Sequence, residues 1–427
     1  MNAAIIFIIL TVLMLTGMPV SISLGLTVLT FLFGFTDVPL ESVALKLFTG
    51  IEKFEIMAIP FFILAGNFLT HGGVAKRMIN FATAMVGHWY GGLGLGGVLA
   101  CALFAAVSGS SPATVVAIGS ILLPAMVKAG FPNRFGAGVI TTSGALGILI
   151  PPSIVMVMYS VATNTSVGAL FMAGVVPGLV LAAVLGGVTW WRARKYNYPR
   201  LPKATWGERW TAFRKSAWGL FLIVVVMGGI YTGMFTPTEA AAMSAVYAFV
   251  VAVFIYKDMS LKDVPKVLLN SANMSAMLLY IITNAVLFSF IMTNENIPQA
   301  LADWMLGNGL GVISFLLAVN VILLLAGNFM EPSSIMLIFA PILFPVAMKL
   351  GIDPVHFGII MVVNMEVGMC HPPVGLNLYV ASGITKMGIT ELTVAVWPWL
   401  LAMLGFLVVV TYWPGLSLWF PRWLGML

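Results

Sequence analysis

Residues 104–126 read FAAVSGSSPATVVAIGSILLPAM, and residues 326–348 read AGNFMEPSSIMLIFAPILFPVAM. In both stretches a polar tip with Ser and Pro interrupts a long apolar run, and the similarity continues on either side. The offset between matching residues stays between 220 and 222: Pro112 and Pro332, Gly130 and Gly351, Gly136 and Gly358, Gly147 and Gly368, Pro152 and Pro373, Pro177 and Pro398. A duplication that repeats helix breakers inside apolar sequence is typical of secondary transporters.

The composition excludes a soluble protein. The 427 residues are 61% hydrophobic and 8% charged, with a mean hydropathy of +1.06, whereas ordinary globular domains carry about 25% charged residues. The 43 Gly and 23 Pro are too many for plain spanning helices, but helix breakers are tolerated where the backbone lines a polar cavity. We therefore predict an all-α polytopic membrane protein. Its first apolar run is expected to be a retained helix, because it lacks a basic n-region and a clear cleavage site.

Positive charge gathers in one hydrophilic connector. Of the 20 Lys and Arg residues, eight lie between Arg192 and Lys215. Basic residues concentrate in cytoplasmic loops of membrane proteins. This rule explains the net charge of +6 better than nucleic-acid binding does. Residues 192–216 are therefore predicted to be a cytoplasmic linker between the two repeats.

The lengths of the apolar segments predict inverted repeats. Segments 91–127 and 312–348 are each split by a polar tip and are too short for two full spans. Each is therefore expected to form a re-entrant hairpin that enters and leaves on one side. Each repeat then crosses the membrane five times, so the second copy is upside down and both termini are periplasmic. Sixteen of the 20 basic residues then lie inside, and four lie outside: Lys46, Lys53, Lys349 and Arg422.

The expected elements follow from this topology. Single helices are expected near residues 3–16, 19–35, 56–70, 169–191, 217–233, 238–256, 276–293 and 394–414, with an amphipathic arm at 74–86. Broken helices are expected at 135–163 and 357–385, and interfacial amphipathic segments at 37–55 and 260–272. The predicted domains are scaffold parts at 1–87 and 217–309 and transport parts at 88–191 and 310–427. Each transport part contains one hairpin and one broken helix.

Four polar breaks are expected to meet near the middle of the membrane. They are the hairpin tips 108–114 and 327–334 and the helix interruptions 141–153 and 364–377. At each break, backbone groups lose their intrahelical partners, which costs several kcal/mol per group in hydrocarbon unless another partner is found. A cation can bind the freed carbonyls, and an anion can bind the freed N–H groups at a half-helix N-terminus. No Lys or Arg falls in any of the breaks.

Polar side chains in the breaks supply candidate oxygen ligands for a cation. They are Ser108, Ser110, Ser111, Thr114, Thr142 and Ser143 in the first half, and Asn328, Ser333, Ser334 and the carbonyls of 366–369 in the second. Hard oxygen ligands without a carboxylate cage suit Na⁺ better than Ca²⁺ or Zn²⁺. For one Ser alone, close helix packing is the simpler interpretation, but the set as a whole favours binding.

Ionisable groups at membrane depth are confined to the second half. Glu331, Glu366 and His371 either relay protons or face a water-filled vestibule and cap half-helices. Asn67 is expected to pack between the repeats. The two cysteines support neither a disulfide framework nor, with His371, a metal site.

Several motifs, in this order along the chain, closely resemble the large membrane subunit of TRAP (tripartite ATP-independent periplasmic) transporters. They read IPFFILAGN (59–67), FAAVSGSSPAT (104–114), GALGILIPPSI (144–154), GIDPVHFGIIMVVN (351–364) and HPPVGLNLYVASGIT (371–385). Within the family the chain is most similar to DctM-type permeases of the C4-dicarboxylate branch. The resemblance implies a sodium-driven elevator transporter of the bacterial inner membrane, with an ion-transporter-superfamily-like fold. It also implies import of organic acids such as succinate, malate or fumarate.

The resemblance also implies partners and sites. The partners are a small four-helix membrane subunit (DctQ-like), expected here as a separate polypeptide, and a periplasmic substrate-binding protein (DctP-like). Neither enzymatic activity nor a cofactor is expected, with Na⁺ as the coupling ion. Carried over by motif, the sodium sites would involve Ser108, Gly109, Ser110, Ser111, Thr142, Ser143, Gly147, Asn328, Glu331, Ser333, Gly368 and Met369. The anion would lie between them, near Ser111, Pro112, Pro151, Pro152, Pro332, Ser334, His371, Pro372, Pro373 and Asn377.

Other functions stay open at this point. One is a TRAP permease for another carboxylate, such as sialic acid or another sugar or keto acid, and another is a stand-alone sodium–dicarboxylate symporter. A membrane subunit of an ion-pumping redox enzyme is disfavoured, because the four His residues include no pair at ligand spacing on one helix face. ATP-driven transport is unsupported, because the sequence has no GxxxxGK[ST] phosphate loop.

Overall fold

The computed structural model describes residues 2–36, 38–373 and 375–427, and within these ranges the regular secondary structure is entirely helical. The first half contains α1 (Asn2–Leu15), α2 (Val20–Phe35), α3 (Leu40–Thr49), η1 (Phe54–Met57), α4 (Ala58–His71), α5 (Val74–Val86), α6 (Gly92–Ser108), α7 (Ser111–Lys128), α8 (Asn133–Gly144), η2 (Ala145–Ile148), α9 (Ile154–Thr163) and α10 (Val167–Lys195). The second half contains α11 (Trp206–Tyr231), α12 (Pro237–Val250), the π-helical η3 (Val251–Ile255), α13 (Val264–Asn294), α14 (Ile297–Gly307), α15 (Val312–Gly327), α16 (Pro332–Lys349), α17 (Pro354–Gly368), α18 (Leu376–Thr385), α19 (Ile389–Tyr412) and α20 (Gly415–Trp423).

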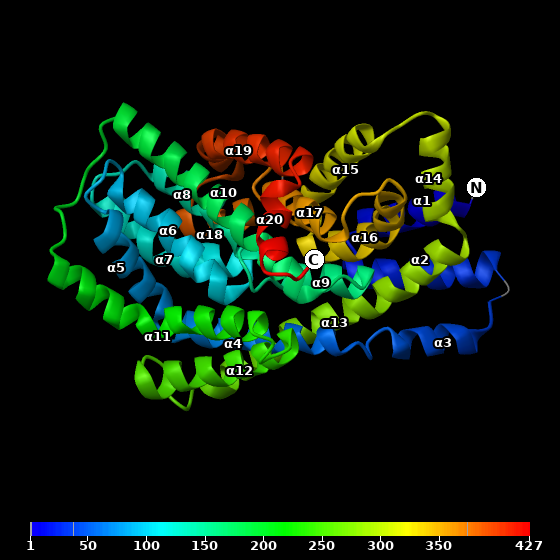
Figure 1. The fold of residues 1–427 in the computed structure, drawn as a ribbon, viewed down its shortest axis with the longest axis horizontal. Helices are drawn as coiled ribbons and strands as arrows, with labels where there is room; N and C mark the ends of the chain where they lie inside the picture. Colours follow the sequence, from blue (N-terminus) through cyan, green and yellow to red (C-terminus); the bar gives the residue numbers. More distant parts are fainter. Residues whose placement is uncertain (1, 37, 374) are drawn as a thin grey trace.

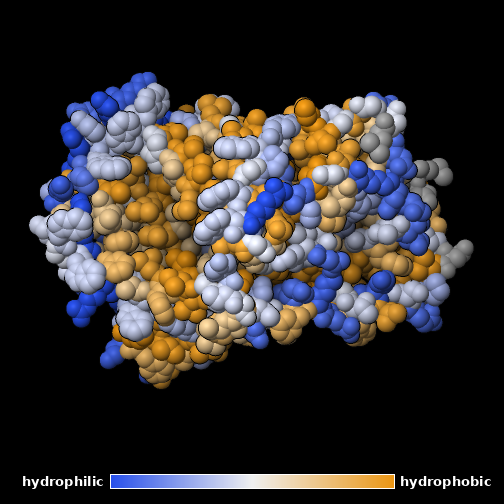
Figure 2. Space-filling model, viewed as in Figure 1, coloured by the Kyte–Doolittle hydropathy of each residue, from blue (hydrophilic) through white to orange (hydrophobic). Residues whose placement is uncertain are grey.

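The helices confirm the expectation of a polytopic membrane protein. Within the described ranges, eight helices are long and apolar enough to cross a membrane, and six shorter apolar helices accompany them. On the face in Figure 2, hydrophobic residues cover much of the surface, and hydrophilic residues gather at the left edge, where Figure 1 places the α10–α11 connector. Figure 1 shows α3, α4, α11, α12 and α13 along one side of the molecule, and α8, α10, α15 and α19 along the opposite side.

The order of elements returns in the second half. Helices α6 and α7 correspond to α15 and α16, and α8 with η2 corresponds to α17, followed by α9 and α18. Packing is reciprocal between the two halves, because α7 contacts α18 while α16 contacts α9. Each hairpin therefore lies against the half-helix that follows the break of the other repeat.

Two segments differ from the sequence-based expectation. Helices α10 and α11 extend into the connector, so only 196–205 lies outside a helix. Thr205 and Glu208 start α11 early with a capping box, in which Thr205 N donates to Glu208 Oε2 at 2.7 Å. The segments expected at 260–272 and 276–293 form the single helix α13, because no Gly or Pro between them stops the helix. The sequence-based assignment also omitted α14 and α20.

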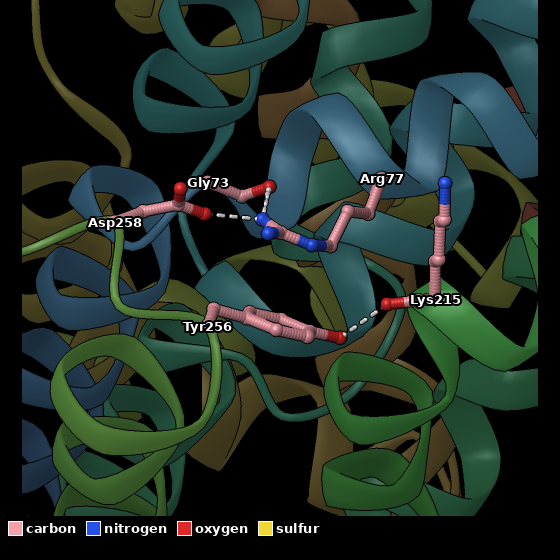
Figure 3. A network of polar contacts seen from close by, with 5 residues as sticks. All are labelled: Gly73, Arg77, Lys215, Tyr256 and Asp258. Atoms are coloured by element: carbon pink, nitrogen blue, oxygen red, sulfur yellow. Dashed lines mark hydrogen bonds and ion pairs between the residues drawn. The ribbon is translucent and has the colours of Figure 1, made fainter.

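A polar network joins three segments on the connector side of the molecule. Figure 3 shows Arg77 of α5 bonded to Gly73 O at 2.9 Å, ion-paired with Asp258 and stacked 3.8 Å from the Tyr256 ring centre. Tyr256 in turn donates its hydroxyl proton to Lys215 O of α11 at 2.7 Å. The network ties α5 to α11 and to the connection between η3 and α13.

Asn67 links the two halves beside the first hairpin, since a Cβ at the preceding Gly66 would lie 3.1 Å from Ser108 O. Its Nδ2 donates to Ser271 Oγ of α13 at 2.7 Å. This contact between α4 and α13 agrees with the packing role expected from the sequence.

Candidate functional site

The first hairpin tip is a tight turn of small polar residues. Helix α6 ends at Ser108, and Gly109 follows with φ +62, a left-handed conformation that favours glycine. Ser108 Oγ lies 2.9 Å from Thr114 Oγ1, which donates to Ser110 O at 2.8 Å. A Cβ at Gly109 would lie 2.9 Å from Pro152 O, so the tip touches the helix break of its own repeat.

Backbone atoms of the first helix break pack directly against this tip, with no side chain between them. A Cβ at Gly147 would lie 2.5 Å from Ser110 O and 2.8 Å from Ser111 Cα, which only glycine avoids. Within the break, Thr142 Oγ1 donates to Gly138 O at 2.8 Å. The hydroxyl of Ser143 is buried and has no hydrogen-bond partner among the described residues. It is thus available as a ligand.

The second tip and break meet in the same way but with different side chains. A Cβ at Gly327 would lie 2.9 Å from Gly368 Cα, so the end of α15 touches the end of α17. The Asn328 amide lies 2.8 Å from His371 Nδ1. With its nitrogen turned to the break it also donates to Pro372 O at 3.0 Å.

Asn377 joins the second break to the first tip. Its Nδ2 donates to Ser111 Oγ at 2.7 Å and lies 3.4 Å from Thr141 O. Its backbone N–H donates to Met369 O at 3.0 Å. Val374, within the same expected break, lies outside the described residues.

Three half-helices begin near these breaks without a side-chain cap. The N-caps of α7, α16 and α18 are Ser110, Glu331 and Gly375, and none accepts a capping bond from its helix. Helix α9 differs, because Ser153 Oγ accepts from Met156 N at 3.4 Å. Helix N-termini without a side-chain cap present the positive end of the macrodipole and any unpaired N–H groups, which together attract anions. In α18 backbone oxygens already take two of these groups, because Asn377 N donates to Met369 O and Leu378 N to Gly375 O.

Two of the buried polar residues of α17, near its C-terminal end, have different environments. Asn364 Nδ2 donates to Asn320 Oδ1 at 2.9 Å, and Asn320 Nδ2 donates to Thr411 Oγ1 at 2.9 Å. Glu366 is 0% exposed, and neither carboxyl oxygen has a hydrogen-bond partner among the described residues. An ionised carboxylate in this setting is strongly disfavoured, so Glu366 requires a bound proton or a cation beside it.

The structure brings the expected site residues together in two clusters, one per repeat, joined by Asn377. Glu331 accepts a bond from Ser334 Oγ at 3.3 Å. Ser333 is buried and forms no side-chain hydrogen bond within the described ranges. The roles of all these residues as ligands stay predictions.

Sequence reasoning did not single out three polar residues, of which Asn364 begins the second helix interruption and Asn320 and Lys53 lie outside the breaks. Asn320 and Asn364 form the buried amide pair described above. Lys53 donates to Val161 O at 2.5 Å and to Asn164 Oδ1 at 2.7 Å, at the C-terminal end of α9. For the two Asn the available signal was a polar residue inside an apolar helix, which is costly unless paired.

Comparisons with known proteins agree with the motifs. The family described as "Tripartite ATP-independent periplasmic transporter, DctM component" matches residues 7–416. The chain is 77% identical to the C4-dicarboxylate TRAP transporter large permease protein DctM of Rhodobacter capsulatus, over 100% of both chains. It is 55% identical to the protein of the same name from Pseudomonas aeruginosa, over 95% of both chains.

A solved structure has a similar fold. The YdaH transporter of Alcanivorax borkumensis, whose topology is described as unusual, superposes with a TM-score of 0.63 and covers 88% of this chain and 89% of its own. The sequences are 16% identical, so this likeness concerns the fold alone.

Proposed function

The chain belongs to the DctM component family of TRAP transporters, and from that premise we propose that it imports C4-dicarboxylates such as succinate, malate and fumarate, driven by Na⁺. The family is a transporter permease subunit rather than an enzyme. The substrate class is supported by the full-length 77% identity to a permease whose name specifies C4-dicarboxylates. The coupling ion is supported by the chemistry of the breaks.

In this proposal the dicarboxylate binds at the N-termini of the uncapped half-helices. The N-termini of α7 and α18 lie together, because Ser111 of one is bonded to Asn377 of the other. A dicarboxylate placed there would face the positive ends of both helices and accept N–H groups at the start of α7, without a buried Lys or Arg. In α18 the Asn377 N–H already donates to Met369 O, so that helix would contribute mainly through its dipole. Pro112, Pro332 and the two double prolines line these turns and donate no backbone hydrogen bonds.

The sodium part rests on unpartnered oxygen ligands. Ser143 in the first break and Glu366 in the second are both buried without hydrogen-bond partners among the described residues. Bound Na⁺ would satisfy such oxygens, together with the carbonyls released where α8 and α17 end.

The ion pairs support the predicted division of the segments between two sides of the membrane. Arg134 pairs with Glu391 at 2.8 Å, and the Arg77 network joins further segments predicted to be cytoplasmic. Lys349 pairs with Asp303 at 3.1 Å, and both are predicted to be periplasmic. Among the described residues, these ion pairs never join groups predicted to lie on opposite sides.

An elevator mechanism is the motion that this packing favours. The reciprocal contacts of α7 with α18 and of α16 with α9 would let both hairpins and both half-helices move as one body. In this proposal a separate small membrane subunit and a periplasmic binding protein complete the transporter in the bacterial inner membrane.

Reconstitution tests the proposed function directly. The chain is placed in liposomes with its small subunit and loaded binding protein, and uptake of succinate, malate and sialic acid is measured with and without a sodium gradient. We expect succinate and malate uptake only with the gradient and with both partners. Uptake by the chain alone would reject the tripartite system, and uptake independent of sodium would reject the coupling. Periplasmic labelling of Thr205→Cys in intact cells would overturn the orientation.

A further inference from the structure

A second concave site lies away from the helix breaks, on the side predicted to be periplasmic. It is a cavity of about 210 Å³ among α3, α9, α13 and α16, which we call the lysine pocket. Its polar lining comes from Lys46, Thr49, Lys53 and Ser289. A water occupies about 30 Å³ of liquid volume, so the pocket has room for a carboxylate and a short carbon chain.

The close approach of two helices holds one wall of the pocket in place. A Cβ at Gly50 would lie 2.7 Å from Val286 Cγ1, so the end of α3 presses against α13. The ammonium of Lys46 lies 5.4 Å from the centre of the Phe290 ring, also on α13. Lys46 is therefore held at the pocket although its side chain is exposed.

The hydrogen-bond donors in the pocket are not used up. Lys53 has three N–H donors, of which Val161 O and Asn164 Oδ1 accept two. Lys46 and the Ser289 hydroxyl donate no hydrogen bond to any described residue, and neither lysine belongs to an ion pair there. Donors therefore remain for an oxygen ligand.

The charge of the pocket selects an anion. The C-terminal end of α9 offsets part of the Lys53 charge, and the C-terminal end of α3 offsets part of the charge of Lys46, which lies in its last turn. Neither lysine is ion-paired with a described residue, so both keep net positive charge at the pocket. Glu55 lies near Lys53 but lines a different cavity of about 380 Å³, on the other side of that lysine. The described residues that line the lysine pocket include no Asp or Glu.

We propose that the lysine pocket binds one carboxylate group of the transported organic anion on the periplasmic side, before the anion reaches the helix breaks. Lys46, Lys53 and Ser289 would donate to the carboxylate oxygens. The pocket lies where α3 and α13 meet α9 and α16, so movement of the transport part would open or dissolve it. This inference rests on the proposed import of organic anions.

Lys46→Gln tests the pocket with little risk to the fold, because the side chain is exposed and its ammonium, beside the Phe290 ring, forms no ion pair with a described residue. Binding of radiolabelled succinate is measured for the chain with its small subunit in nanodiscs, without binding protein. Loss of one charge-assisted hydrogen bond is expected to weaken succinate binding about tenfold. The half-saturating concentration of loaded binding protein in the uptake assay should rise with it, at unchanged maximal rate.

Two matched variants separate charge from structure. Lys46→Arg keeps the charge and should restore binding to within about twofold of the unmodified chain. Lys349→Gln removes another exposed lysine of the same predicted side and should change nothing, because Lys349 is paired with Asp303. The neutral diamide of succinate should compete poorly with succinate.

Each other result of the binding and uptake experiments would reject one specific part of the proposal. Unchanged succinate binding in Lys46→Gln would overturn the lysine pocket while uptake by the unmodified complex leaves the proposed function intact. Altered uptake with unchanged direct binding would mean that Lys46 acts on the binding protein instead. Failure of the unmodified complex to take up or bind succinate would overturn the proposed function itself.

Discussion

The two helix breaks have a similar backbone arrangement but differ in the chemistry of their side chains. In the first, the polar groups around Ser108 and Thr142 are neutral and bond mainly within their own repeat. In the second, His371 is bonded to Asn328, and Glu366 is buried without a hydrogen-bond partner among the described residues. The comparison teaches that the duplicated features are those that shape the chain, whereas the ionisable groups belong to one copy alone.

The repeated glycines have a physical reason. Gly147 lets its break touch the backbone of the first hairpin, and Gly368 lets the other break touch Gly327. The two contacts are unequally tight, with shortest Cβ distances of 2.5 Å for Gly147 and 3.1 Å for Gly368. The comparison can therefore be tested position by position.

The largest effect is expected from Gly147→Ala. The new methyl group would meet backbone atoms of Ser110 and Ser111 that cannot swing aside, and overpacking of this kind costs about 1–3 kcal/mol. We expect Gly147→Ala to lose about 3 kcal/mol of stability and most of its succinate uptake. Gly368→Ala should lose about 1 kcal/mol of stability. Thermal unfolding in detergent and uptake in liposomes measure both.

Gly383→Ala is the matched control, because a Cβ at this position of α18 would meet nothing within 4 Å. Alanine is the better helix former by about 1 kcal/mol, so stability should be unchanged or slightly higher. If Gly147→Ala behaved like this control, the tight contact between tip and break would be wrong.

The next largest effects on stability are expected from two substitutions in α17, and they should have opposite signs. Asn364→Leu leaves the buried Asn320 Oδ1 without its donor and should cost about 2 kcal/mol of stability. Glu366→Met removes a buried carboxyl that has no described partner, and should leave stability unchanged or raise it by about 1 kcal/mol. Sodium-driven uptake should nevertheless be lost in Glu366→Met.

Glu366→Gln distinguishes a proton held by the Glu366 carboxyl from a cation coordinated by it. If Glu366 holds a proton, the amide mimics it in shape and charge, and uptake should survive. If it coordinates a cation, uptake should fail while the protein still folds. A clear loss of stability in Glu366→Met would contradict both, since it would reveal a structural partner.

The sequence predicted much of this arrangement because helix breaks are local features. The arm expected at 74–86 is α5, Val74–Val86, and both hairpins bend at the expected Ser- and Pro-containing tips. Membership in the TRAP family, suggested by five motifs, is confirmed by the match over residues 7–416. The inverted orientation of the repeats stays a prediction.

Long-range pairings could not be predicted in the same way. Asn377 and Ser111 are 266 residues apart, and nothing in either local sequence specifies the other. Lys53 likewise meets Asn164 only because η1 packs against α9. Local reasoning also divided α13 in two, since amphipathic and apolar patterns alternate along one unbroken helix.

The smallest effect on stability should come from Ser110→Ala and Ser333→Ala, one residue from each tip. Neither hydroxyl forms a hydrogen bond to a described residue, so each substitution should change stability by less than about 0.5 kcal/mol. If the tips hold Na⁺, both substitutions should raise the sodium concentration for half-maximal uptake.

Ser111→Ala is the contrasting variant, because its hydroxyl is bonded to Asn377 and its loss should cost about 1 kcal/mol. Sodium activation that shifts in only one of the two tips would place the coupling site in that repeat. No shift in either would remove both serines from the cation sites.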